Sequence, residues 1–153
     1  MKRSTYFLLF LLLFPAVLFS QAQTSSAELA KIIKSVETHK SYDRNRYPLG
    51  LFTEELYRKE AEFAGKKLQE LKSVSSQGLS ESEKISKELL RFKLQEEVDR
   101  YKFKAYLNPL LSDAGFHVSL PYQVRPLNDY REVRNYLKLL AAIPEFVDQH
   151  LVL

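Results

Sequence analysis

The stretch LSESEKISKELLRFKLQEEVDRY, residues 79–101, decides the fold of this chain of 153 residues. Ser80 and Glu83 form an S-x-x-E capping box, in which each side chain bonds a free backbone N–H group at the start of a helix. Apolar residues then recur at helical spacing in two rows: Ile85, Leu89 and Phe92 in one, and Leu90, Leu94, Val98, Tyr101 and Ala105 in the other. The pattern predicts a helix that ends near Tyr106 and, with two apolar rows, has neighbours on both sides.

Three further segments carry the same pattern. Residues 27–39 place Leu29, Ile32, Ile33 and Val36 on one face, and Ser25 or Ser26 is the expected N-cap. Residues 53–74 begin with Thr53 as N-cap, and residues 128–143 begin at Asn128 or Asp129. The last of these segments has one apolar face made of Tyr130, Val133, Leu137, Leu140 and Ala141. Pro144 then either starts a new helix, since proline is tolerated in a first turn, or kinks the preceding one.

Proline and glycine mark two connections, residues 41–52 and residues 108–126. Within the second, residues 116–120 are expected to form a short extended piece. The sequence predicts an all-α protein, an antiparallel bundle of about four to five helices with one long irregular loop. We expect this bundle to be part of a larger helical protein, and the role of the 108–126 loop stays open.

The composition excludes several classes of protein. An apolar share of 45%, with 10 Phe and 9 Tyr, excludes disorder over most of the chain. The sequence has no Cys, which excludes disulfides, zinc sites with Cys ligands and thiol nucleophiles. The formal net charge is +4, and it falls to +2 when Lys2 and Arg3 are removed with residues 1–22. A nearly neutral, mixed surface argues against a nucleic-acid partner.

The first residues are typical of a secretory signal peptide. Lys2 and Arg3 precede an apolar run over residues 6–19, and small residues follow, so we expect cleavage between Ala22 and Gln23. The alternative is a membrane anchor, but the run falls short of the roughly 20 residues that span a bilayer. The sequence therefore predicts a signal peptide over 1–22 and a helical region over 23–153. The product is exported to the periplasm or the extracellular space, with no stable membrane anchor after cleavage.

The sequence offers no catalytic motif, so no catalytic residue and no metal ligand is predicted. His39, His117 and His150 lie far apart, and none belongs to an H-E-x-x-H pair of zinc ligands. Solvated or partly packed histidines are expected instead. The acid pairs Glu54/Glu55 and Glu96/Glu97 read as a solvated charged face.

Two loops are candidate binding segments, because loops carry function more often than helices do. They are residues 46–50 and residues 115–122, where His117 and Tyr122 would line the rim of a pocket. The alternative, which we favour, is that Phe116, Val118 and Leu120 close the bundle while His117 and Ser119 face water.

The order and spacing of four stretches resemble the N-terminal part of the bacterial domain of unknown function 885 family. They are YPLG (47–50), residues 79–101, GFHVSLP (115–121) and DYREVRNYLKLLAAIPEFVDQHL (129–151). The resemblance implies an exported, zinc-peptidase-like helical fold. Members of the family carry a His-Glu-x-x-Pro-Gly-His stretch in their C-terminal half, which supplies two zinc ligands and a general base. No position of this chain matches that stretch.

Two hypotheses follow. In the first, the chain is the N-terminal fragment of an exported zinc-dependent peptidase or hydrolase of unknown substrate, truncated at its C-terminus and inactive alone. Its partner is then the missing C-terminal region, zinc is expected only in the full-length protein, and that protein has a peptide substrate. In the second, the chain is a small secreted helical binding or scaffold module with no enzymatic activity.

Overall fold

The computed structural model describes residues 24–108, 115–121, 124 and 126–153, and within them every regular element is helical, as predicted. The expected signal peptide, its cleavage site at Ala22 and Gln23, and Tyr122 lie outside the described residues. The chain divides into two compact units. Of the described residues, those in 24–39 and 64–96 form the first unit, and those in 40–63 and 97–153 form the second.

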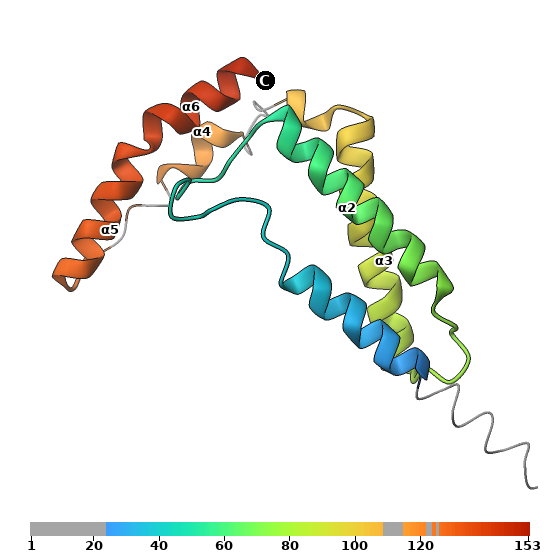
Figure 1. The fold of residues 1–153 in the computed structure, drawn as a ribbon. Coiled ribbons are helices and arrows are strands. Elements are labelled where there is room, and N and C mark those ends of the chain that lie inside the picture. Colours follow the sequence, from blue (N-terminus) through green and yellow to red (C-terminus); the bar gives the residue numbers. More distant parts are fainter. Residues whose placement is uncertain (1–23, 109–114, 122–123, 125) are drawn as a thin grey trace, which may run out of the picture. The chain divides into compact units, whose positions relative to one another are not determined.

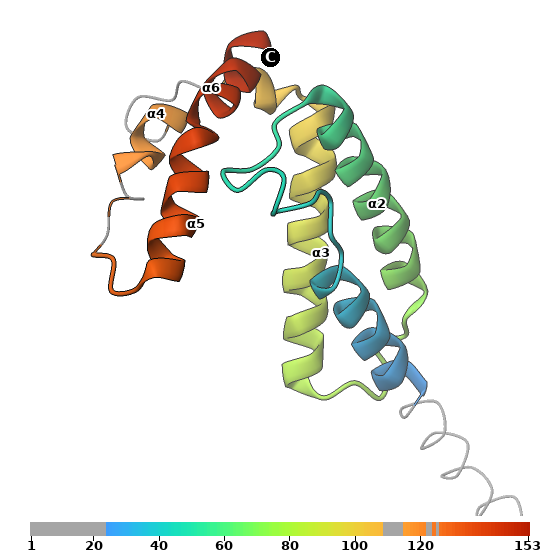
Figure 2. The same cartoon turned by 60° about the vertical axis from the view of Figure 1, so that its left-hand side comes forward.

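The core of the first unit lies among three helical stretches that run side by side (Figures 1 and 2). They are residues 24–37, the second half of α2 (Glu54–Ser73) and most of α3 (Glu81–Lys102). Leu29 and Leu71 are the largest fully buried side chains. The other buried apolar residues of this unit are Ile32, Ala64, Leu68, Val74, Leu79 and Leu94.

The predicted capping box is present at the start of α3. The Ser80 backbone N–H donates to Glu83 Oε2 over 2.8 Å, and the Glu83 N–H donates to Ser80 Oγ over 3.3 Å. The Ser26 hydroxyl donates to the other carboxylate oxygen of Glu83, so the cap also joins α3 to the helix over 24–37. One carboxylate therefore fixes both the first turn of α3 and a neighbouring helix.

The expected N-cap at Ser25 or Ser26 is wrong. Both residues already lie within the helix, where Ser25 is buried and Ser26 bonds Glu83. The Ser26 hydroxyl donates a charge-assisted hydrogen bond to the Glu83 carboxylate instead of accepting one from a backbone N–H group of its own helix.

The expectation that both apolar rows of α3 are covered is also wrong. Leu94 of the second row is 4% exposed, but Ile85, Leu89 and Phe92 are 62%, 60% and 65% exposed. The helix over 24–37 and α2 cover only one side of α3 (Figures 1 and 2). A row of three large apolar side chains thus remains on the surface of the first unit.

The second unit contains the start of α2, the end of α3 and three further helices. These are α4 (Phe116–Ser119), α5 (Tyr130–Ala141) and α6 (Ile143–Val152). The predicted caps hold: Thr53 Oγ1 accepts from the Leu56 N–H, and Asp129 Oδ1 accepts from the Glu132 N–H. Pro144 begins a new helix, one of the two expected alternatives, at the first turn of α6.

Two expectations in this unit are wrong. Helix α3 ends at Lys102, before Tyr106, because Lys104 adopts the left-handed conformation (φ 53°) and a short 3-10 turn, Ala105–Leu107, follows. Residues 116–119 form a short helix and not an extended piece.

The apolar face of α5 is uncovered, and no residue of this helix is buried. In the described part of the chain, no helix has the length and apolar character that crossing a bilayer requires.

The two rows of α3 can be compared by a matched pair of substitutions. Leu94→Ala should lower the free energy of unfolding by about 2–5 kcal/mol, because it leaves a cavity in the core. Leu89→Ala should change it by no more than about 0.5 kcal/mol, since Leu89 already faces solvent. Urea unfolding measures both; equal losses would contradict the assignment of the buried row.

The cap at Glu83 predicts a pH effect. Hydrogen bonds from Ser26, and then from the Ser80 side chain and backbone, hold the pKa of Glu83 below its usual 4.5. A lowered pKa in the folded state stabilises the fold above the unfolded-state pKa, and this contribution is lost as pH falls. The stability difference between the chain and Glu83→Gln should be constant near neutral pH and shrink below pH 4.5. A difference that grows on acidification would contradict the role of the carboxylate.

Candidate functional site

A pocket of about 560 Å³ lies in the second unit, between the start of α2 and the outer face of α6. Its apolar lining comes from Phe52, Leu107, Val152 and Leu153. Its polar lining comes from Thr53, Glu54, Glu145, Asp148 and Gln149. The pocket therefore combines an apolar surface with the carboxylates of Glu54, Glu145 and Asp148.

A tight turn leads the chain into this pocket. The Gly50 N–H donates to the Tyr47 carbonyl over 3.1 Å, and Gly50 has a φ of +108°, which side-chain-bearing residues rarely adopt. A Cβ at this position would stand 2.5 Å from the Phe52 ring. Glycine is thus required here both for the turn and for the approach of Phe52.

Two polar contacts fasten the segment before α2 to α6. The Phe52 N–H donates to Gln149 Oε1 over 2.7 Å, and Arg46 pairs with Glu145 at 3.2 Å. The Arg46 guanidinium also lies over the Tyr47 ring, 5.0 Å from its centroid. The Arg46–Glu145 pair is exposed and contributes little stability, whereas the Phe52–Gln149 bond satisfies a partly buried backbone group.

An aromatic cluster with His150 at its centre closes the inner side of α6. The ring centroid of His150 lies 4.3 Å from that of Phe52 and 4.5 Å from those of Phe116 and Phe146. His150 is 8% exposed, and its Nδ1 is 2.7 Å from the Phe146 carbonyl oxygen. Packing among three phenylalanine rings makes this histidine part of a core.

A stack of tyrosines joins the start of α2 to the 3-10 turn. The Tyr106 ring stacks on Tyr57 at 4.8 Å and on Tyr101 at 5.9 Å between centroids. Burial raises the pKa of Tyr57 above its usual value, and burial followed by the charge of Glu54 raises that of Tyr106. Both phenols are therefore neutral at physiological pH and act as packing groups.

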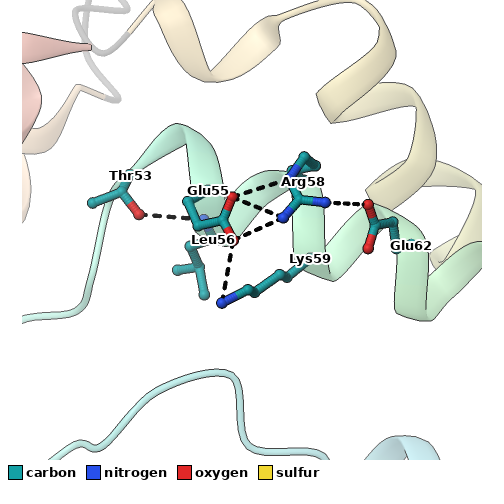
Figure 3. A network of polar contacts seen from close by, with 6 residues as sticks. All are labelled: Thr53, Glu55, Leu56, Arg58, Lys59 and Glu62. Carbon is teal, nitrogen blue, oxygen red and sulfur yellow. Dashed lines mark hydrogen bonds and ion pairs between the residues drawn. The ribbon is translucent and has the colours of Figure 1, made fainter.

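One member of each acid pair, Glu55 and Glu97, lies in surface ion pairs as expected, whereas Glu54 lines the pocket. Glu55 bonds Arg58 and pairs with Lys59, and Arg58 also bonds Glu62 (Figure 3). These cations hold the pKa of Glu55 below its usual value, so it stays ionised. Glu97 pairs with Arg100 at 3.6 Å. Carboxylates held in such pairs carry no sign of an acid–base role.

The predicted binding loops have different outcomes. Residues 46–50 do lead into the pocket, through the turn at Gly50. In the other loop His117 is exposed, while Phe116, Val118 and Leu120 are partly covered and Phe116 packs on Phe146 and His150. Packing of Phe116 in the aromatic cluster and exposure of His117 agree with the favoured alternative, whereas the side chain of Ser119 lies outside the described part of the structure.

Sequence reasoning missed the pocket and the burial of His150. Phe52 and Gln149 are separated by 97 positions, and no local pattern links residues so far apart. His39 is half-buried in the first unit, so the three histidines do not share one environment. Within the described ranges no three His, Asp or Glu side chains are grouped as metal ligands would be.

The lining of the pocket suits an amphiphilic ligand. Its apolar surface would accept a hydrocarbon group, and the carboxylates of Glu54 and Asp148 favour a cationic end. Comparison with known families, with curated proteins and with solved structures finds no match to this chain.

The Phe52–Gln149 bond generates a prediction. Gln149→Ala should lower the free energy of unfolding by about 1–3 kcal/mol, because the Phe52 N–H loses its acceptor in a partly buried place. Asp148→Ala, on the same helix and exposed, is the control and should change it by no more than about 0.5 kcal/mol. Equal effects in thermal or urea unfolding would show that the bond contributes nothing.

Proposed function

We propose that this chain is the N-terminal helical region of a larger exported, zinc-peptidase-like hydrolase. In this proposal it forms a helical wall beside the substrate cleft and supplies neither a zinc ligand nor a catalytic residue. Zinc, the general base and the contacts to a peptide substrate then belong to the C-terminal region of the same protein. The resemblance of residues 47–50, 79–101, 115–121 and 129–151 supplies the identity of the hydrolase.

The observation that carries this proposal is the uncovered row on α3. Ile85, Leu89 and Phe92 lie in line on one side of the helix and expose more than half of their surface. Amphipathic helices are stable because their apolar faces are buried against another element. Further helices of the same protein, packed on this side of α3, would bury the row and place the first unit within a larger domain.

The second candidate is a small exported binding module without enzymatic activity. The pocket beside α6 favours it, because the pocket is large enough for a small amphiphilic ligand and is lined by residues of a single unit. In that case the occupant of the pocket, and not a C-terminal region, defines the function.

Two measurements distinguish the two candidate functions. They are the sequence of the reading frame around these 153 codons and the metal content of the purified native product. The hydrolase proposal expects a frame that encodes a downstream zinc-binding helix, and a purified product with bound zinc. A product without that helix and without zinc would overturn it and leave the binding module.

A dye-binding experiment tests whether the apolar row of Ile85, Leu89 and Phe92 on α3 is exposed. The chain should enhance the fluorescence of anilinonaphthalene sulfonate, and Leu89→Lys with Phe92→Lys should remove much of the enhancement, because the dye binds exposed apolar surface. Ser82→Lys, at an exposed polar position of the same helix, is the control. Equal dye binding by all three proteins would contradict an uncovered row on α3.

A further inference from the structure

Helix α5 in the second unit carries an exposed apolar row next to its packed side. Tyr130 and Leu137 are 76% and 59% exposed, and Val133 and Leu140 are exposed with them. The half-buried residues Tyr136 and Leu139 mark the packed side of the same helix. The uncovered row runs the length of this 12-residue helix.

Basic side chains form a second row along the uncovered one. Arg131, Arg134 and Lys138 are all exposed, and each directly follows a member of the apolar row. One residue is about 100° around a helix, so the two rows lie next to each other. The Arg134 guanidinium lies over the Tyr130 ring, 5.2 Å from its centroid, where the rows meet.

Negative charge on α5 is confined to its first turn. Glu132 is the one acidic residue between positions 130 and 141, and its carboxylate accepts from the Asn128 backbone N–H over 2.8 Å. That bond directs the carboxylate to the helix start. The face made of the two rows is therefore apolar and positively charged.

We propose that α5 docks peripherally and reversibly on an anionic lipid surface. The apolar row enters the region between headgroups and acyl chains, and the arginine and lysine stems reach up to the lipid phosphates. This arrangement of an aromatic and aliphatic row beside a basic row is typical of helices that lie in a membrane interface. The proposal goes beyond the hydrolase function and does not depend on it.

The charge pattern favours lipid over a protein partner. The acidic headgroups of a membrane neutralise basic side chains wherever they lie along the helix, whereas a protein would have to place an acid opposite each one. A second copy of α5 would bring the same cations together and repel. The apolar and basic rows together match the interface of an anionic bilayer, where negatively charged headgroups cover apolar acyl chains.

The chain contains no Trp, so a single tryptophan can report on one position of α5. In the full chain, Leu137→Trp places the reporter in the apolar row, and Asn135→Trp places it at an exposed position on the other side of the helix. Fluorescence is recorded with vesicles of equal parts phosphatidylcholine and phosphatidylglycerol, and with pure phosphatidylcholine. A local reporter separates α5 from the apolar run at residues 6–19.

We expect the emission of Leu137→Trp to shift to the blue with the anionic vesicles only, and that of Asn135→Trp to stay unchanged. Emission that is unchanged by anionic vesicles would overturn the proposal. An equal shift with pure phosphatidylcholine would overturn the role of charge. Emission that is already blue without vesicles and depends on protein concentration would assign the face to a protein contact instead.

Variants that lack two basic side chains of α5 measure how much these charges contribute to lipid binding. Arg131→Gln with Lys138→Gln, in the Leu137→Trp chain, should raise the lipid concentration needed for half of the shift by roughly 25-fold, since each basic residue contributes about fivefold near an anionic surface. Lys66→Gln with Lys72→Gln removes the same charge at exposed positions on α2 and is the control. Equal lipid requirements for the two variants would contradict docking through α5.

Discussion

Among the described residues, Leu29 and Leu71 are the largest fully buried side chains, and the first unit is built on the packing that encloses them. Three helical stretches supply this core, and the two that pack on α3 cover only one of its sides. Leu94 therefore enters the core while Leu89, five positions earlier on the same helix, stays in water. Among the described residues, the helices that pack on α3 cover one side only, so one apolar row stays exposed.

The second unit is held together by different contacts. The rings of Phe52, Phe116 and Phe146 surround His150, and one backbone bond to Gln149 fixes the start of α2 against α6. The pocket follows from this arrangement, since the same segment that carries Phe52 into the cluster also forms one pocket wall. The remaining helix, α5, contributes little to the core and presents apolar and basic side chains to its surroundings.

Local signals predicted the helix starts well, because a cap involves residues only three positions apart. Ser80 with Glu83, Thr53 and Asp129 all cap the helices expected of them. Contacts between distant segments were beyond the sequence pattern. Both rows of α3 are apolar, so spacing alone does not say which one is buried. The position of His150 depends on Phe52 and Phe116, which lie far away in the chain. The sequence pattern also could not predict that Ser26 bonds Glu83 instead of capping its own helix, because the two residues are 57 positions apart.

Helix α3 is buried on one side and exposed on the other. The chain has no Cys, so thiol reactivity can be measured at single chosen positions. We expect Leu89→Cys to react with a maleimide as fast as a free thiol, and Leu94→Cys to react far more slowly under native conditions. Equal rates at the two positions, or faster reaction at position 94, would show that α3 is not buried on the side of Leu94 alone.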